Sequence, residues 1–189
     1  MHRNEKAKVF LLTSYAENEG KSTTSANIAL TLARRNNRVA LLDMDFYKSS
    51  LNKVFEMDCS EDRDLALHLS GKKPIETYQF YKHPDTELYL GLNKRSHNDF
   101  VDWIHLPKMA RAMNYLRESG QFDYIIIDTP PVSVAAEVTT LLRFVDRTIL
   151  VTRTDYVYAE DINDVILTLS SHGKSFAGCI LNDVYREVS

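Results

Sequence analysis

The sequence predicts an α/β fold in which a mostly parallel central sheet carries helices on both faces. The main observation is that short apolar runs, each suited to a buried strand, alternate with segments of helical periodicity. Such alternation is typical of parallel sheets, because the crossover between two parallel strands is usually a helix. The second observation is composition: 189 residues that are 44% hydrophobic and 26% charged suit one globular domain with a sizeable core.

The expected elements follow in a regular order, with one irregular stretch. The expected strands are residues 8–14, 38–43, 87–92, 123–128, 147–152 and 176–181. The expected helices are residues 21–36, 105–119, 135–145 and 159–172. Between the second and third strands we expect short helices at 51–57 and 64–69 and a loop at 78–84. No repeat or interdomain linker interrupts the chain, so we expect residues 1–189 to form a single domain.

Residues 16–23, between the first strand and the first helix, read Ala-Glu-Asn-Glu-Gly-Lys-Ser-Thr. Its Gly20-Lys21-Ser22 segment matches the end of the phosphate-binding loop pattern G-x-x-x-x-G-K-[ST], and the first glycine of that pattern is absent. A loop that enters a helix aims free N–H groups and the positive end of the helix dipole at one point. We therefore expect Glu19, Gly20, Lys21, Ser22 and Thr23 to contact a nucleotide. The alternative is an ordinary strand–turn–helix with a surface lysine.

Aspartates end two of the other expected strands. Asp43 and Asp45 follow the second strand, and Asp128 follows the fourth. Ligands of parallel sheets bind beyond the carboxyl ends of the strands, and Mg²⁺ takes one or two carboxylates together with phosphate oxygens and waters. We therefore expect a magnesium site involving Asp45 and Asp128, with turn or cap roles as the alternative, above all for Asp45.

Composition excludes several other classes of function. The net charge of −3 and a pI near 6.1 give no basic field for nucleic acid. No apolar run approaches the roughly 20 residues of a membrane span. The six histidines show no metal-ligand spacing, and the two cysteines form no C-x-x-C motif. We expect a cytoplasmic protein that needs a partner for any membrane association.

Together, Gly20-Lys21-Ser22-Thr23, Asp43-x-Asp45 and Ile-Ile-Ile-Asp128-Thr-Pro-Pro resemble the motifs of the bacterial tyrosine kinases (BY-kinases), which govern capsule and exopolysaccharide synthesis. The resemblance runs from about residue 8 to residue 184. The family is allied to the P-loop ATPases of partition and cell-division-site placement, which usually carry an extra lysine early in the loop. Here Ala16 takes that position, which favours the kinase branch.

The resemblance implies a role for each matching residue, with ATP and Mg²⁺ as cofactors. Lys21 would contact the transferring phosphate. Ser22 would ligate Mg²⁺, which Asp128 and Asp45 would hold directly or through water. Asp43 would orient or deprotonate the acceptor tyrosine hydroxyl, whose pKa of roughly 10 calls for help at neutral pH.

The resemblance also implies that Asn182, after the last strand, reads the adenine edge; a strand-ending turn residue is the alternative. The implied function is a cytoplasmic ATP-dependent protein-tyrosine kinase domain that regulates capsular or exopolysaccharide synthesis and export. The alternatives are a partition-type P-loop ATPase switch and a catalytically weak, kinase-like regulatory module. The implied partner is a membrane-anchored chain-length or activator protein that recruits the chain to the inner face of the membrane, with homo-oligomerisation also possible.

The sequence departs from the family pattern at several positions. Glu17 and Asn18 replace a proline and a glycine; asparagine tolerates left-handed φ, whereas Glu17 would weaken nucleotide binding if it pointed inward. Lys48 is one cation where the family usually has two arginines. The N-terminal arm for ring assembly and the C-terminal tyrosine tail are expected to be short or absent, with Tyr185 as the last tyrosine.

A few aromatic residues outside these motifs leave alternatives open. Tyr78 and Tyr81 could be surface phosphate acceptors, whereas Tyr89 is expected to pack within its strand. Trp103 could belong to the core or to a docking patch, and the core is favoured because apolar clusters usually pack.

Overall fold

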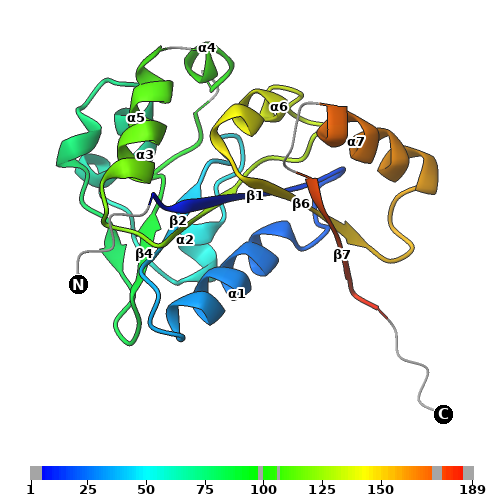
Figure 1. Cartoon of the computed structure of the whole chain (residues 1–189), viewed down its shortest axis with the longest axis horizontal. Helices are drawn as coiled ribbons and strands as arrows, with labels where there is room; N and C mark the ends of the chain where they lie inside the picture. The colour runs from blue at the N-terminus through cyan, green and yellow to red at the C-terminus, as the bar shows by residue number, and fades with distance from the viewer. Residues whose placement is uncertain (1–5, 98–99, 106, 172–175, 185–189) are drawn as a thin grey trace.

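The structure is a computed structural model that describes residues 6–97, 100–105, 107–171 and 176–184. Seven strands form one sheet in the order β3-β4-β2-β5-β1-β6-β7 (Figure 1). Every neighbouring pair is parallel except β3 and β4, which are antiparallel. The strands are β1 (Lys8–Ser14), β2 (Val39–Asp43), β3 (Tyr81–Lys82), β4 (Leu88–Gly91), β5 (Tyr124–Asp128), β6 (Arg147–Arg153) and β7 (Phe176–Asn182).

Helices cover both faces of this sheet. The α-helices are α1 (Lys21–Ala33), α2 (Leu51–Val54), α3 (Leu65–Leu69), α4 (Phe100–Ile104), α5 (Pro107–Glu118), α6 (Val138–Leu141) and α7 (Ala159–Ser171). Short 3₁₀ turns lie at Glu61–Arg63, Ile75–Thr77 and Leu142–Phe144. α1 and α2 share one buried cluster with the sheet, and α3 to α7 share the other. The predicted fold class is confirmed.

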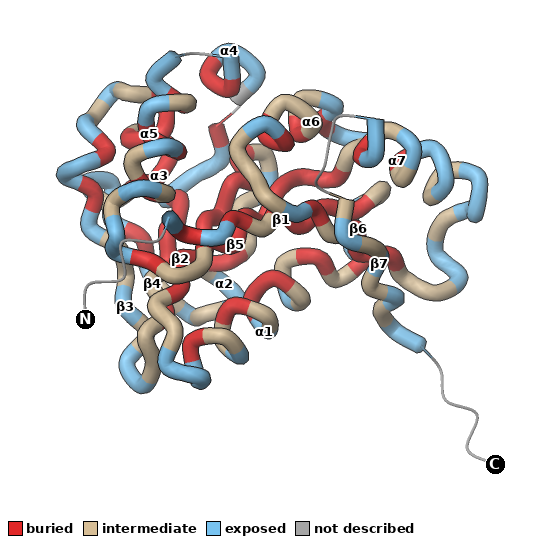
Figure 2. Tube along the Cα trace, viewed as in Figure 1, coloured by how far each residue is buried: buried red, intermediate tan, exposed pale blue. Residues whose placement is uncertain are grey.

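Burial explains why the central strands are almost purely apolar. All five residues of β2 are buried, because helices cover both of its faces. Figure 2 shows the middle strands buried along most of their length, whereas β7 at the edge has no buried residue. Such strands cannot alternate polar and apolar residues, which is why they read as continuous apolar runs.

Strand register brings the acidic residues together. Asp43 at the end of β2 pairs with Asp128 at the end of β5, and Leu12 of β1 pairs with Asp128 on the other side. The carboxyl ends of β1, β2 and β5 therefore meet at the loop that follows β1. This is the edge at which parallel sheets bind ligands.

Some predicted boundaries differ from the structure. The expected loop at 78–84 contains the short strand β3, and the helix expected at 105–119 begins at Pro107, with α4 as a separate helix before it. The helix expected at 135–145 is α6 followed by a 3₁₀ turn. Proline is favoured at the first position of a helix, since it has no N–H to leave unpaired, and this explains the start of α5.

The structure also places the aromatic residues that the sequence left open. Tyr78 is buried, and its hydroxyl accepts a hydrogen bond from the N–H of Leu92, so it is not a surface acceptor. Tyr81 and Tyr89 are half-buried. Trp103 is in the core, with its ring edge-on to Phe46 at 6.0 Å between centroids. Tyr185 lies outside the described residues. No helix among the described residues is long and apolar enough to cross a membrane.

Candidate functional site

The phosphate-binding loop is shaped by two residues in left-handed backbone conformation. Asn18 has φ 62°, and Gly20, the N-cap of α1, has φ 85°. The expectation that Asn18 tolerates this region is confirmed. Gly20 is needed for a second reason: a Cβ there would lie 2.0 Å from Nδ2 of Asn182. The loop is therefore closely packed against the last strand of the sheet.

Glu19 braces the loop from inside. Its side chain is buried; Oε2 accepts a hydrogen bond from the N–H of Ala16 at 2.7 Å, and Oε1 accepts one from the N–H of Arg153 at 3.3 Å. The carbonyl of Glu19 accepts a hydrogen bond from Nδ2 of Asn182 at 3.0 Å. β6 and β7 thus both hydrogen-bond to the loop at Glu19. A buried carboxylate that accepts two N–H groups fixes a backbone conformation that would otherwise be one of many.

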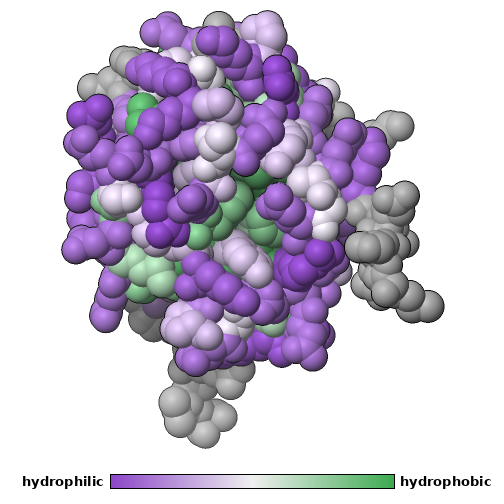
Figure 3. All heavy atoms as spheres, turned by 90° about the vertical axis from the view of Figure 1, so that its left-hand side faces the viewer, coloured by the Kyte–Doolittle hydropathy of each residue, from purple (hydrophilic) through white to green (hydrophobic). Residues whose placement is uncertain are grey.

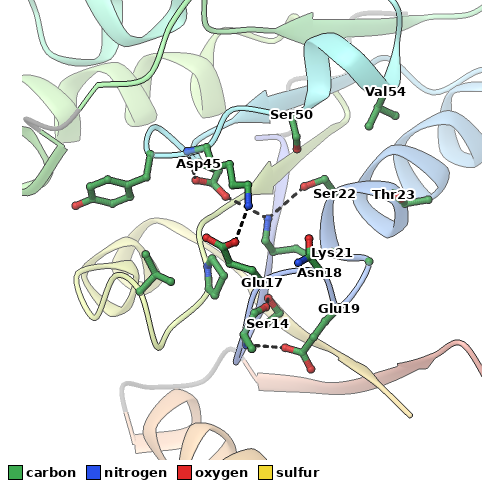
Figure 4. Close-up of a pocket in the computed structure, with 16 residues that line it drawn as sticks. Ser14, Glu17, Asn18, Glu19, Lys21, Ser22, Thr23, Asp45, Ser50 and Val54 are labelled. Carbon is green, nitrogen blue, oxygen red and sulfur yellow. Dashed lines mark hydrogen bonds and ion pairs between the residues drawn. The ribbon is translucent and has the colours of Figure 1, made fainter. Parts of the chain in front are cut away.

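Lys21 reaches back from the first turn of α1 to the acidic strand ends. Its Nζ lies 3.2 Å from Oδ1 of Asp128. Figure 4 shows the same Nζ beside Asp45, with 3.7 Å between it and Oδ2. The same ammonium donates to Oγ of Ser22 at 3.3 Å. Lys21 is 6% exposed, so this charge is held almost out of water between two carboxylates. Removing Lys21 would leave two buried carboxylates without their cation, and removing one partner of a buried ion pair strongly destabilises the folded protein.

Asp128 lies beneath the loop with one oxygen committed and one free. Oδ1 accepts hydrogen bonds from Lys21 and from Oγ of Ser25, at 3.2 and 2.9 Å. Oδ2 is buried and has no hydrogen-bond partner among the described residues. A buried carboxylate oxygen without a partner costs about 1–3 kcal/mol or more, unless a cation or water satisfies it.

A hard cation fits this donor set. The free Oδ2 of Asp128, the carboxylate of Asp45 and the hydroxyl of Ser22 are the oxygen donors that Mg²⁺ prefers. The described residues contain no group of three or more histidine, cysteine or acidic side chains arranged to hold a metal by themselves. That suits Mg²⁺, which usually completes its shell with phosphate oxygens and waters.

Asp43 has a different environment from Asp45. Its Oδ2 accepts a hydrogen bond from Oγ of Ser49 at 2.6 Å and longer ones from the N–H groups of Ser50 and Leu51, at the start of α2. It is completely buried, and burial, with the charge of Asp128 as the second cause, raises the pKa of Asp43 to about 7. To reach an acceptor hydroxyl, Oδ2 of Asp43 would have to leave these donors.

Asp45 faces the cavity beside the loop. This cavity has a volume of about 350 Å³, and Lys21, Ser22, Thr23 and Asp45 line it. Burial raises the pKa of Asp45, and the charge of Lys21 opposes that rise. The structure therefore places a carboxylate with raised proton affinity at the wall of the cavity, with its other oxygen held by the N–H of Lys48 at 3.0 Å.

The mouth of the cavity is bordered by an ion pair that joins two departures from the family pattern. Nζ of Lys48 lies 2.6 Å from Oε2 of Glu17, and both residues line the cavity. In Figure 4 the carboxylate of Glu17 takes part in this ion pair and does not point toward Ser22. The negative charge of Glu17 is therefore balanced by the cation of the neighbouring loop.

The structure brings most of the predicted site residues together. The cavity is lined by Glu19, Gly20, Lys21, Ser22, Thr23 and Asp45, whereas Asp43, Asp128 and Asn182 are not among its lining residues. Asn182 contacts the back of the loop through Glu19 and Gly20. Sequence reasoning missed Ser25 and Ser49. The signal for Ser25 was available, because a residue four positions after Lys21 lies on the same face of α1.

Comparisons with known proteins place this site in a family. The family described as "ParA: NUBPL iron-transfer P-loop NTPase" matches residues 8–187. The tyrosine-protein kinase CpsD of Streptococcus pneumoniae serotype 4 is 31% identical over 178 residues, which cover 94% of this chain and 77% of that relative. The chain belongs to the bacterial tyrosine kinases within the ParA family. The resemblance predicted from the motifs is thus confirmed.

Solved structures agree with this placement. The kinase domain of VpsO superimposes on this BY-kinase with a TM-score of 0.83 at 26% identity, covering 97% of this chain and 88% of that one. The septum site-determining protein MinD of Pyrococcus horikoshii, solved with Mg-ADP, gives a TM-score of 0.77 at 22% identity over 93% of this chain and 70% of that one. The MinD likeness shows a shared fold alone. Family membership implies nucleotide binding.

Proposed function

We propose that this BY-kinase is an ATP-dependent protein-tyrosine kinase domain that acts in capsular or exopolysaccharide synthesis. The observation that carries the proposal is Lys21, held between Asp128 and Asp45 in a cavity that a phosphate-binding loop borders. CpsD, the relative at 31% identity, is named a tyrosine-protein kinase. Phosphoryl transfer depends mainly on positioning and charge neutralisation, and this cavity offers both.

The roles of the residues follow from their positions. The backbone N–H groups at the start of α1 hold the phosphates, and Lys21 neutralises the transferring group. Ser22, Asp45 and Asp128 would hold Mg²⁺, which neutralises charge on the phosphate oxygens when it is bound. Because Lys21 contacts both aspartates, it is already at the point where phosphate and metal ligands meet.

The acceptor hydroxyl needs a carboxylate within hydrogen-bond reach. Asp45 faces the cavity, so of the two carboxylates it is the one that an acceptor hydroxyl can reach, with Mg²⁺ then held by Asp45 through water. We assign Asp43 the role of a positioning residue: its Oδ1 accepts from the N–H of Asp45 at 3.3 Å while its Oδ2 holds the start of α2. Asn182 supports the loop from behind, and its contact with adenine stays a prediction.

Kinases and ATPases use the same phosphate-binding loop, so we also propose, as the alternative hypothesis, a partition-type P-loop ATPase switch. That alternative is an ATP-driven switch without an acceptor protein, which the P-loop NTPase family model also accommodates. For the kinase reading we propose a membrane-anchored activator and self-association as partners, by analogy with the family, and action at the inner face of the membrane. The single-domain organisation of residues 1–189 remains part of this proposal.

The test is formation of phosphotyrosine from Mg-ATP by the full chain, alongside release of inorganic phosphate. Lys21→Met should abolish phosphotyrosine, whereas Lys94→Met, at an exposed lysine outside the phosphate-binding loop cavity, should not change it. Phosphate release without phosphotyrosine would favour the ATPase switch. Equal phosphotyrosine from the wild type and Lys21→Met would refute the catalytic assignment.

A further inference from the structure

The backbone next to Asp45 is held from outside by the support segment, residues 92–97, which follows β4. Nδ2 of Asn93 donates a hydrogen bond to the carbonyl oxygen of Asp43 at 2.7 Å, and this contact is buried. Asn93 is 0% exposed and is not among the residues that line the phosphate-binding loop cavity. Any effect of Asn93 on the site must therefore pass through the backbone that it holds.

Further hydrogen bonds fix the chain on both sides of Asp45. The N–H of Met44 donates to the carbonyl oxygen of Asp128 at 2.8 Å, and the N–H of His97 donates to the carbonyl oxygen of Phe46 at 2.7 Å. The backbone is thus held one residue before Asp45 and one residue after it. What remains free in Asp45 is rotation of its side chain, so the support segment helps to decide where the carboxylate points.

The amide of Asn93 joins this backbone to the start of α3. Its Oδ1 accepts a hydrogen bond from the N–H of Ala66 at 3.1 Å, while its Nδ2 donates to Asp43. An amide can donate and accept at the same time, whereas an alkyl chain does neither and an ionised carboxylate only accepts. Asparagine is therefore suited to a place that faces an N–H on one side and a carbonyl on the other.

The start of α3 also holds the other parts of the support segment. The N–H of Leu65 donates to the carbonyl oxygen of Leu92 at 2.9 Å. Oδ2 of Asp64, the N-cap of α3, lies 3.1 Å from Nε2 of His97, and these two side chains are 3% and 7% exposed. The support segment is therefore fastened to α3 at both of its ends, and it cannot shift without breaking buried contacts.

Three aromatic rings pack where the support segment meets the loop after β2. The ring of Phe46 lies edge-on to those of His97 and Trp103, at 6.5 and 6.0 Å between centroids. Phe46 is 0% exposed, and the other two residues are buried. Figure 3 shows the side of the molecule that carries α3 and α5, and its surface is mostly hydrophilic. The ring contacts thus belong to the close-packed interior, which stiffens the chain next to Asp45.

We propose that Asn93 is a positioning residue for phosphoryl transfer, because it holds the carbonyl of Asp43 and thereby the direction of the Asp45 carboxylate. This role rests on the proposed function, in which Asp45 meets the acceptor hydroxyl and holds Mg²⁺ through water. A residue that only stabilised the fold would change how much of the protein is folded. A positioning residue changes the rate of the folded protein, since a misplacement of about 1 Å can cost roughly 10²-fold.

The first variant is Asn93→Ala in the full chain, assayed with Mg-ATP and a random copolymer of glutamate and tyrosine as the acceptor. We expect kcat per folded molecule to fall by about 10-fold, the lower end of what the partners of metal-holding side chains contribute. The Kd of ADP without Mg²⁺ should stay the same, because Glu19 holds the phosphate-binding loop to β6 and β7. Urea unfolding followed by circular dichroism gives the folded fraction.

Tyr78→Phe is the matched control. The hydroxyl of Tyr78 accepts a buried hydrogen bond from the N–H of Leu92, one residue before Asn93. The variant leaves a buried donor unpaired in the same segment, but it keeps the hydrogen bonds from that segment to Asp43 and Phe46. Stability should fall, whereas kcat per folded molecule should not change.

A double-mutant cycle shows whether Asn93 acts through Asp45. Asp45→Asn removes the carboxylate whose direction is at issue, so the loss of kcat caused by Asn93→Ala should be nearly absent in that background. A residue that acts only on the fold would cost the same factor in both backgrounds. The same cycle can be measured without turnover. Asn93→Ala should lower the Mg²⁺ affinity of the ADP-bound protein by about 10-fold when Asp45 is present, and leave it unchanged in Asp45→Asn.

His97→Phe gives a second route where Asn93→Ala does not fold. It keeps the main-chain N–H that donates to Phe46 and an aromatic ring beside Trp103, and it removes the contact with Asp64. Release of this end of the support segment should lower kcat per folded molecule when Asp45 is present and leave it unchanged in Asp45→Asn.

An unchanged kcat in folded Asn93→Ala, or in His97→Phe as its substitute, would overturn the positioning role. So would an equal factor lost with and without the carboxylate of Asp45, or a loss in Tyr78→Phe as large as that in Asn93→Ala. Failure of the proposed function looks different, since the wild type itself would then form no phosphotyrosine. In that case the Mg²⁺ affinity of the ADP-bound protein still decides whether Asn93 directs Asp45.

Discussion

Gly20→Ala tests how the last strand shapes the phosphate-binding loop. The new Cβ would lie 2.0 Å from Nδ2 of Asn182, the atom that donates to the carbonyl of Glu19. The residue would also have to keep φ at 85°, which alanine adopts only with strain. The asparagine side chain must therefore move, and its hydrogen bond is lost.

The magnitude is the sum of two terms. The left-handed conformation costs alanine about 1–2 kcal/mol, and the lost hydrogen bond contributes about 0.5–1.5 kcal/mol. We expect the free energy of unfolding to fall by about 1.5–3.5 kcal/mol, which for a chain of this size lowers Tm by roughly 3–14 °C. Urea unfolding followed by circular dichroism, with linear extrapolation to water, measures the first quantity.

The matched control is the same change in an Asn182→Ala background. There the obstructing amide is absent, so Gly20→Ala should cost only the conformational term, about 1–2 kcal/mol. The difference between the two backgrounds is the coupling energy between Gly20 and Asn182. An equal cost in both backgrounds would refute the contact between loop and strand. Affinity for a fluorescent ADP analogue should fall in the single Gly20→Ala variant, because the N–H groups of the loop lose their alignment.

Two further predictions concern charges near the cavity. Glu17→Gln should raise ADP affinity only slightly in the wild type but more in a Lys48→Met background, since Lys48 already neutralises Glu17; the coupling should be small, because the pair is exposed to solvent. Equal gains in both backgrounds, by ADP titration, would contradict the pairing. Burial raises the pKa of Asp43 to about 7, so the folded protein still binds a proton that the unfolded chain releases near pH 4. The free energy of unfolding without nucleotide should therefore decrease as the pH rises from about 4 to 7. Asp43→Asn should flatten that fall, and an identical pH profile for wild type and variant would count against the raised pKa.

The sheet and the loop could be predicted from the sequence because their physical causes are local. Continuous apolar runs mark strands that are buried on both faces, and the Gly-Lys-Ser-Thr segment marks a loop before a helix. The strand β3 has only two residues, so it carries no period for a pattern to reveal. Its pairing with β4 is set by tertiary contacts.

The direction of each site side chain was less predictable. Asp43 and Asp45 are two apart and would share a face in a continuing strand, but β2 ends at Asp43. The chain then turns, so that Asp43 binds the start of α2 while Asp45 faces the cavity. The pairing of Glu17 with Lys48 joins two loops 31 positions apart, which no local pattern encodes.

The brace at Glu19 has a consequence for kinetics. Its carboxylate and carbonyl join the phosphate-binding loop to β6 and β7, and β7 is one of the two edge strands of the sheet. Edge strands fray more readily than central ones, so local opening of β7 releases the loop with it. Amide hydrogen exchange in the loop should therefore follow that of the edge. How long a nucleotide stays bound is then set partly by fraying of this edge strand.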